Sequence, residues 1–200
     1  MARIITLDED SHKYTVDGEP VPSVSEITRF ISREIYSEIS QYTLENAAAR
    51  GTKVHKATES LEILGDAEVD EEIAPYVEAY VKFRREHQVH WDKVEWMACY
   101  KDQFCGTLDR IGVVDGEEAI LDIKTSSALQ KVLYTAQLSL YMMLARENGF
   151  EPKKMVILHL TKDGKYKLVE LQEDQKLAES LLYLHNALKK KSRKRKEKES

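Results

Sequence analysis

Two aspartates and a lysine are spaced so that a predicted β-hairpin would bring them together on one face. The dipeptide Asp115-Gly116 is a strong signal for a two-residue turn, and pairing outward from it sets Asp109 opposite Asp122. Opposed side chains on antiparallel strands have Cβ atoms about 4.5–5.5 Å apart, a span over which two carboxylates can share one divalent cation. Lys124 follows Asp122 by two residues and therefore points to the same face.

The Asp-X-Lys triplet is a weak motif when it stands alone. Such a triplet is more often an ordinary ion pair at the margin of a sheet than a catalytic group. Ile111, Val113 and Ile120 lie on the same predicted face, and acids beside apolar side chains are costly unless they are paired. The interpretation therefore depends on the other elements of the chain.

Hydrophobic periodicity predicts the elements that position these groups. Alternation with period two predicts strands over 3–7, 12–16, 93–100, 104–114, 119–123, 155–160 and 165–171. Helical spacing predicts helices over 23–30, 41–64, 71–87, 129–148 and 174–188. Ser23 with Glu26 has the form of a capping box, and Gly65 is a typical helix stop. The order predicts one α/β domain over 1–188, without a repeat or an internal linker.

The composition is that of an ordinary globular protein, with 200 residues of which 42% are hydrophobic and 32% charged. The net charge of −5 conceals an asymmetry along the chain. Residues 189–200 hold eight of the 30 basic and two of the 35 acidic side chains, which leaves 22 basic and 33 acidic in 1–188. The predicted domain is therefore acidic, and it is followed by a basic tail that we expect to be disordered.

This charge distribution restricts how the chain could bind nucleic acid. The basic tail could contact phosphates non-specifically, or it could be a solvated end with no fixed partner. The acidic domain would repel nucleic acid over most of its surface. A DNA site would therefore have to be a local groove in which metal ions offset the carboxylates.

The cysteines and the apolar segments exclude several other classes of protein. Cys99 and Cys105 are too few for a disulfide framework or a four-cysteine metal site, and we expect both to be ordinary core residues. No segment has the apolar length of a signal peptide or a membrane span, so we expect a cytoplasmic protein of a bacterial or phage-infected cell, without a membrane partner.

Four short segments occur in an order that is typical of one nuclease family. They are RGTKVHKATE at 50–59, GTLD at 106–109, DIKT at 122–125 and QLSLY at 137–141. This set resembles the PD-(D/E)XK nuclease superfamily, most closely its RecB-like branch with the phage-type exonucleases. The resemblance implies a restriction-endonuclease-like core, in which a central mixed β-sheet is flanked by helices. Leu108 replaces the proline of the family's name, and the second acid is Asp122 rather than glutamate.

The resemblance also implies roles for individual residues in phosphodiester hydrolysis. Asp109, Asp122, the backbone carbonyl of Ile123 and the imidazole of His55 would bind Mg²⁺ or Mn²⁺. These hard ions favour oxygen ligands, and the imidazole favours Mn²⁺ somewhat. Lys124 would position or deprotonate the attacking water. Gln137 and Tyr141, the first and last residues of the fourth segment, would contact DNA or brace the site.

Several of these positions have simpler explanations. A lone histidine beside an apolar helical stripe, such as His55, is more often structural. Glu59, four residues later, could hold the imidazole, or it could pair with a neighbouring lysine. Glu95 precedes Asp109 on the neighbouring strand and could supply a further acid. Packing in the core would also explain Tyr141.

We therefore expect a metal-dependent DNA nuclease, most simply an exonuclease in recombination, repair or phage replication. An endonuclease and a non-catalytic DNA-binding protein of the same fold are the alternatives, although the second would be expected to have lost an acid or the lysine. No GxxxxGK[ST] phosphate-binding loop is present, so any ATP-driven unwinding would need a helicase or a recombination protein as partner.

Overall fold

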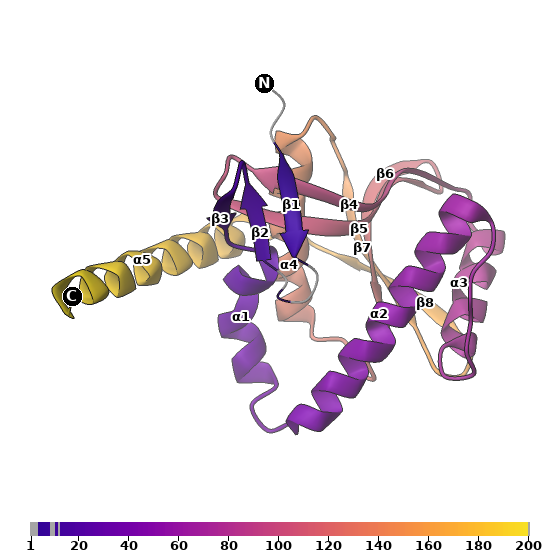
Figure 1. The fold of residues 1–200 in the computed structure, drawn as a ribbon. Coiled ribbons are helices and arrows are strands. Elements are labelled where there is room, and N and C mark those ends of the chain that lie inside the picture. Colours follow the sequence, from indigo (N-terminus) through magenta and orange to yellow (C-terminus); the bar gives the residue numbers. More distant parts are fainter. Residues whose placement is uncertain (1–3, 9–10, 12, 200) are drawn as a thin grey trace.

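The computed structural model describes residues 4–8, 11 and 13–199, and it arranges them as two β-sheets with helices packed around the larger one (Figure 1). The smaller sheet has the order β1-β2-β3, with β1 (Ile5–Asp8), β2 (Lys13–Val16) and β3 (Glu19–Val21). The larger sheet has the order β4-β5-β6-β7-β8, with β4 (Val89–Tyr100), β5 (Phe104–Val114), β6 (Glu117–Lys124), β7 (Lys154–Leu160) and β8 (Tyr166–Leu171). The helices are α1 (Val24–Ile35), α2 (Gln41–Leu64), α3 (Ala74–Glu86), α4 (Lys131–Glu147) and α5 (Gln175–Glu199).

The larger sheet is mixed, as predicted. The meander β4-β5-β6 is antiparallel, and α4 then carries the chain across to β7, which pairs parallel to β6. The hairpin of β7 and β8 completes the sheet. A crossover helix between parallel strands is the usual solution, because a tight turn can join antiparallel strands only.

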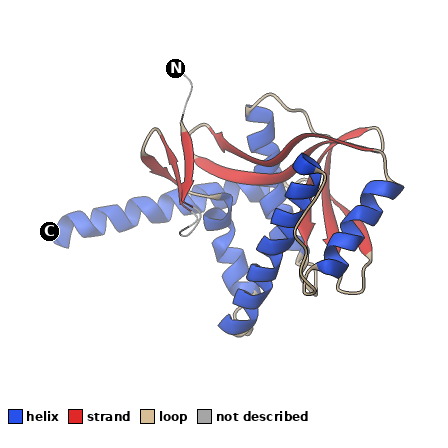
Figure 2. Cartoon of the chain, turned by 45° about the vertical axis from the view of Figure 1, so that its right-hand side comes forward, coloured by secondary structure: helices blue, strands red, loops and turns tan. Residues whose placement is uncertain are grey.

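The two faces of this sheet are covered by different helices (Figure 2). Ala119, Leu121 and Ile123 of β6 pack in the cluster formed with α2 and α3. Ile120 points the other way, into the cluster formed with α1, α4 and α5. Because side chains alternate along a strand, Asp122 and Lys124 follow Ile120 onto the face covered by α4.

Local signals set the helix boundaries. The capping box of α1 is confirmed, since Ser23 Oγ accepts from the Glu26 amide and Glu26 Oε2 accepts from the Ser23 amide, each at 3.0 Å. The helix continues past the predicted end at residue 30 because Ile31 and Ile35 pack against the core. Gly65 ends α2 with a φ of +75°, a conformation that suits glycine.

The N-terminal boundaries of α3 and β4 differ from the prediction. The helix begins at Ala74 rather than 71, because the Asp70 carboxylate accepts from the Ile73 amide and holds a turn before it. The strand begins at Val89 rather than 93. An irregularity of register between Trp91 and Lys93 interrupts the alternation there, so the pattern concealed the first part of β4.

The chain ends also differ from the prediction in detail. The first hairpin is confirmed, and β3 adds a third strand to it after the turn at Asp17; expected strand residues Arg3 and His12 lie outside the described residues. At the other end, α5 does not stop at 188 but continues to Glu199, so the backbone of 189–199 is helical where we expected a disordered tail. Figure 2 shows this helix projecting away from the sheets.

The two cysteines form a disulfide, which corrects the expectation that they are unlinked core residues. Both are buried, but β4 and β5 pair Cys99 directly with Cys105, and their Cα atoms are 4.0 Å apart. The number of cysteines does not reveal this pairing, which comes from the register of the β4–β5 hairpin. Among the described residues, no helix has the length and apolar character to cross a membrane.

Candidate active site

The candidate site lies where β5 and β6 diverge. The predicted turn is confirmed: Asp115 and Gly116 have φ values of +50° and +86°, and the pairing runs from Val114 with Glu117 to Arg110 with Leu121. The next position in the register is Asp109 opposite Asp122. There the ladder stops, and Asp109 Oδ2 accepts from the Ile123 amide at 2.6 Å.

Asp122 and Lys124 form an ion pair, which the sequence offered as the simpler explanation of the triplet. The Lys124 ammonium contacts Asp122 Oδ2 and lies 5.2 Å from the centroid of the Tyr134 ring. Asp122 Oδ2 is buried and, among the described residues, makes no hydrogen bond of normal geometry. This oxygen forms a buried ion pair with the Lys124 ammonium.

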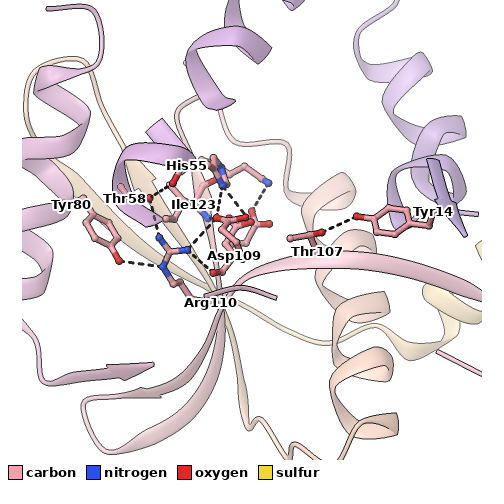
Figure 3. Close-up of polar contacts among 11 residues, drawn as sticks. Tyr14, His55, Thr58, Tyr80, Thr107, Asp109, Arg110 and Ile123 are labelled. Atoms are coloured by element: carbon pink, nitrogen blue, oxygen red, sulfur yellow. Dashed lines mark hydrogen bonds and ion pairs between the residues drawn. The ribbon is translucent and has the colours of Figure 1, made fainter. Parts of the chain in front are cut away.

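His55 projects from α2 toward the same strand ends (Figure 3). Its Nε2 is 3.2 Å from the Ile123 carbonyl, and its Nδ1 is 3.2 Å from Glu95 Oε1 and 3.5 Å from Asp109 Oδ1. All three partners are acceptors, so both ring nitrogens donate and the imidazole is positively charged in this arrangement. The structure thus places His55, Asp109 and the Ile123 carbonyl together, as the family resemblance implied.

Glu95, which the sequence offered as a possible further acid, lies beside His55 and Asp109. One ligand atom from each of His55, Glu95 and Asp109 lies within 4.8 Å of the others, a grouping that could hold a metal ion. The predicted helix partner Glu59 is not the carboxylate that contacts His55. The register does contain the missing signal, because pairs on either side of Glu95 and Asp109 place these two acids opposite each other.

Burial and mutual charge shift the pKa values of these groups. Burial lowers the pKa of His55, but the charge of Asp109 and the hydrogen bond with Glu95 outweigh it and raise that pKa to about 9. Burial raises the pKa of Asp122 to about 6 against the attraction of Lys124. Burial also raises the pKa of Asp109. The site therefore holds carboxylates whose negative charge is poorly solvated, a state that a bound cation would relieve.

Lys124 keeps its proton in this setting. Burial lowers its pKa, but the nearby charges of Asp122 and Asp109 more than compensate, so the pKa is raised above the usual lysine value. Lys124 is therefore an ammonium at neutral pH and cannot act as a base without a change in its surroundings.

Helix α4 closes the site on the other side. The buried ring of Tyr141 lies against Gly106, where an added Cβ would be 2.7 Å from Tyr141 Cε1. Burial, and then the charges of Asp122 and Asp109, raise the pKa of Tyr141 well above its usual value, so its hydroxyl remains protonated. The Gln137 side chain hydrogen-bonds to Tyr141. Tyr141 therefore belongs to the wall of the site as well as to the core, and Gln137 contacts it.

A mixed sheet with helices on both faces, and with two acids and a lysine at neighbouring strand ends, is the restriction-endonuclease-like fold. The sequence profile of the PD-(D/E)XK nuclease superfamily matches residues 37–198, and the chain belongs to that superfamily. Nucleases of this superfamily use divalent metal ions.

Solved structures with a similar arrangement include two exonucleases. An alkaline exonuclease from Laribacter hongkongensis is 12% identical, with 90% of this chain and 95% of that chain covered and a TM-score of 0.44. A phage-related exonuclease from Haemophilus somnus 129PT is 11% identical, with 90% and 96% covered and a TM-score of 0.46. These likenesses are too distant to carry an argument about activity. A search of curated protein sequences gave no match.

Proposed function

We propose that this protein is a deoxyribonuclease that hydrolyses phosphodiester bonds with Mg²⁺ or Mn²⁺ as its metal. The observation that supports it most directly is the convergence of His55, Glu95 and Asp109 beside the Asp122–Lys124 ion pair. A structural ion pair does not need three further ionisable groups around it. Membership of a nuclease superfamily supports the same conclusion.

The donor set fits a hard divalent ion. We propose that Asp109, Asp122, the Ile123 carbonyl and His55 hold it, and that Glu95 supplies a further acid. Carboxylate and carbonyl oxygens suit Mg²⁺ and Mn²⁺, and the single imidazole favours Mn²⁺ somewhat. The buried Asp122 carboxylate is already paired with one cation, the Lys124 ammonium, and is an oxygen ligand of the kind that such an ion favours. When bound, such an ion lowers the pKa of water and offsets negative charge on a phosphate.

Lys124 is positively charged and lies beside a proposed metal ligand, so it can act on the phosphate. Its ammonium is held beside Asp122. We propose that it acts as an ammonium, which orients the attacking water and stabilises the negative charge that develops on the phosphate, rather than as the base; in the metal-free protein the charges of Asp122 and Asp109 raise its pKa and favour this form. This choice refines the two roles that the sequence left open.

The residues of α4 serve positioning and substrate contact. We propose that the buried ring of Tyr141 braces the strand ends, since it packs against Gly106 of β5. The Gln137 amide would contact DNA at the edge of the site. The aromatic face of Tyr134 supports the Lys124 ammonium at 5.2 Å.

DNA is the substrate we propose, with cleavage from an end during recombination, repair or phage replication. The exonuclease part rests on the family resemblance of the four sequence segments. The acidic domain makes non-specific attraction weak, so the basic segment 189–200 is proposed to contact phosphates beyond the site. A helicase or recombination protein could supply the DNA end.

A digestion experiment tests the proposal. Linear and covalently closed circular DNA, each labelled, would be incubated with Mg²⁺ or Mn²⁺ and with wild type, Asp122→Asn or Asp92→Asn. Asp92 is an exposed acid on β4 away from the site and is the matched control. We expect mononucleotide release from linear DNA only, lowered about 100-fold or more by Asp122→Asn and unchanged by Asp92→Asn. Cut circles would indicate an endonuclease.

The same experiment separates the non-catalytic alternative. Retention of Asp109, Asp122 and Lys124 favours an enzyme. DNA binding without cleavage under every metal condition would instead indicate a binding protein. Cleavage that persists in EDTA, or in Asp122→Asn at the wild-type rate, would contradict the proposed function.

A further inference from the structure

Arg110 is a fully buried cation on β5, with 0% of its side chain exposed. Placing an unpaired ion in a protein interior costs several kcal/mol, so its donors are expected to have partners. Nη1 donates to the Asp109 carbonyl at 2.6 Å and to Glu95 Oε1 at 3.2 Å. Nη2 donates to Thr58 Oγ1 at 3.0 Å, and Nε donates to the Tyr80 hydroxyl at 3.3 Å. The guanidinium is thus fixed in one orientation (Figure 3).

These partners come from four different elements. Glu95 is on β4, Thr58 on α2 and Tyr80 on α3, while Asp109 precedes Arg110 on β5. Thr58 in turn donates to the backbone carbonyl of His55 at 3.0 Å. The guanidinium is therefore linked to all three residues of the cluster. It contacts the Glu95 side chain and the Asp109 carbonyl directly, and it reaches the His55 carbonyl through Thr58.

Glu95 needs such support. It has a φ of +43° in the interior of β4, a conformation that is strained for a non-glycine residue. Its carboxylate lies close to the carboxylate of Asp109, and like charges repel. Oε1 accepts from both Arg110 Nη1 and His55 Nδ1, each at 3.2 Å, and among the described residues Oε2 has no hydrogen-bond partner.

We propose that Arg110 is a positioning residue that holds Glu95 against His55 and Asp109, so that one Glu95 oxygen is directed at the metal. The inference rests on the proposed metal-dependent function. Arg110 does not contact the metal or the substrate. Arg110 offsets the charge of Glu95 from the side of the sheet that α2 and α3 cover. The ends of β5 and β6 are left free for a cation.

A purely structural role for Arg110 predicts something different. A buried arginine that only ties helices to the sheet would affect the free energy of unfolding and leave metal affinity unchanged. Arg84 provides the comparison. It pairs with Glu62 at 2.7 Å and donates to the Val89 carbonyl at 2.9 Å, and both of these partners lie outside the cluster.

The test is a double-mutant cycle on Mn²⁺ affinity. Calorimetric titration with Mn²⁺ would be carried out on wild type, Arg110→Gln, Glu95→Gln, the double variant and Arg84→Gln. Circular dichroism on each sample would check that the protein is folded. We expect Arg110→Gln to weaken Mn²⁺ binding about 10- to 100-fold, as is typical when a group that orients a metal ligand is removed. In the Glu95→Gln background the same change should have little further effect, and Arg84→Gln should lower Tm only.

A second variant keeps the test decisive if Arg110→Gln does not fold. Arg110→Lys retains the charge but lacks the planar fork, so it should fold and still weaken Mn²⁺ binding. Wild-type affinity in the folded Arg110 variants, or an equal loss with and without Glu95→Gln, would refute the positioning role. A wild-type protein that neither binds Mn²⁺ nor cleaves DNA would instead refute the proposed function.

Discussion

Asp109 accepts a hydrogen bond of 2.6 Å from the backbone amide of Ile123, at the position where β5 and β6 stop pairing. The carbonyl of the same Ile123 accepts from His55 Nε2 at 3.2 Å. The Asp109 carboxylate, a proposed metal ligand, thus replaces the backbone carbonyl that would accept this hydrogen bond in a continued sheet. It also holds the Ile123 carbonyl, a second proposed ligand, in position. The Asp109 carboxylate therefore has both a structural role and a role in the proposed chemistry.

The two roles of Asp109 can be separated by substitution. Asp109→Asn retains an oxygen that can accept from the Ile123 amide, whereas Asp109→Ala leaves that buried amide unpaired, at a cost of about 1–3 kcal/mol. We expect both variants to lose Mn²⁺ binding, and the alanine variant to be less stable than the asparagine variant by that amount. Urea denaturation and Mn²⁺ titration measure the two effects. Equal stabilities, or wild-type Mn²⁺ affinity in either variant, would contradict this division.

Lys124 is expected to affect the rate and not metal binding. Lys124→Gln removes the ammonium beside Asp122, so kcat should fall about 10²- to 10³-fold. Mn²⁺ affinity should be unchanged or higher, because a positive charge near the ion has been removed. Steady-state kinetics and calorimetry measure these quantities, with the exposed Lys167 on β8 replaced by Gln as control. Weaker Mn²⁺ binding in Lys124→Gln would show that the lysine holds the site together instead.

Metal binding should release a proton from His55. Its pKa in the metal-free protein is about 9, and only the neutral imidazole can bind a metal. Because the proton competes with the ion, Mn²⁺ affinity should rise with pH from about 7 and level off above about 9. Calorimetry at neutral pH, in two buffers of different ionisation enthalpy, should give about one proton released per Mn²⁺. In His55→Gln this release should be absent; its persistence would assign the proton to another group.

The same pKa shift makes the stability of the metal-free protein depend on pH. A histidine whose pKa is raised in the folded state stabilises that state below its unfolded pKa. This contribution decreases as pH rises through the folded pKa of about 9. In the metal-free protein, Tm should therefore fall as the pH rises above neutral. This fall should be smaller in His55→Gln.

The local part of the site could be predicted from the sequence. One turn, Asp115-Gly116, determines the register of β5 and β6, and the alternation of strand residues then places Asp122 and Lys124 on one face. These inferences need only neighbouring residues. The confirmed register follows from them, whereas the mixed sheet was implied by the family resemblance.

The non-local part could not be predicted in the same way. The contact between His55 and Glu95 joins residues 40 positions apart and depends on the left-handed backbone of Glu95. Helical spacing favoured Glu59 as the partner because it considers a single helix. Arg110 is likewise enclosed by three other elements, which no single element reveals. The Cys99–Cys105 pair, by contrast, spans only six positions and follows from the register of the β4–β5 hairpin.

Replacing Gly106 or Gly51 with alanine should change the free energy of unfolding in opposite directions. In Gly106→Ala the new Cβ would meet Tyr141 Cε1 at 2.7 Å and Val24 Cγ2 at 3.0 Å, so we expect a loss of about 1–3 kcal/mol in the free energy of unfolding. Gly51 lies within α2, where the nearest atom, Thr125 Oγ1, is 3.9 Å away. Gly51→Ala should stabilise the protein by up to about 1 kcal/mol. Urea denaturation of both variants provides the comparison, and a neutral Gly106→Ala would show that Tyr141 can move.

The basic segment 189–200 is expected to control salt-sensitive DNA binding. The rest of the chain is acidic, so replacing the lysines and arginines of 189–198 with glutamine removes most of the local attraction for phosphate while retaining chain length. The slope of log affinity against log salt should become shallower by about 0.9 for each duplex phosphate that the segment no longer neutralises. Fluorescence anisotropy at several salt concentrations measures it, with Mn²⁺ affinity as the control that should not change. An unchanged slope would assign DNA binding to the strand-end site alone, because that site would then neutralise every bound phosphate.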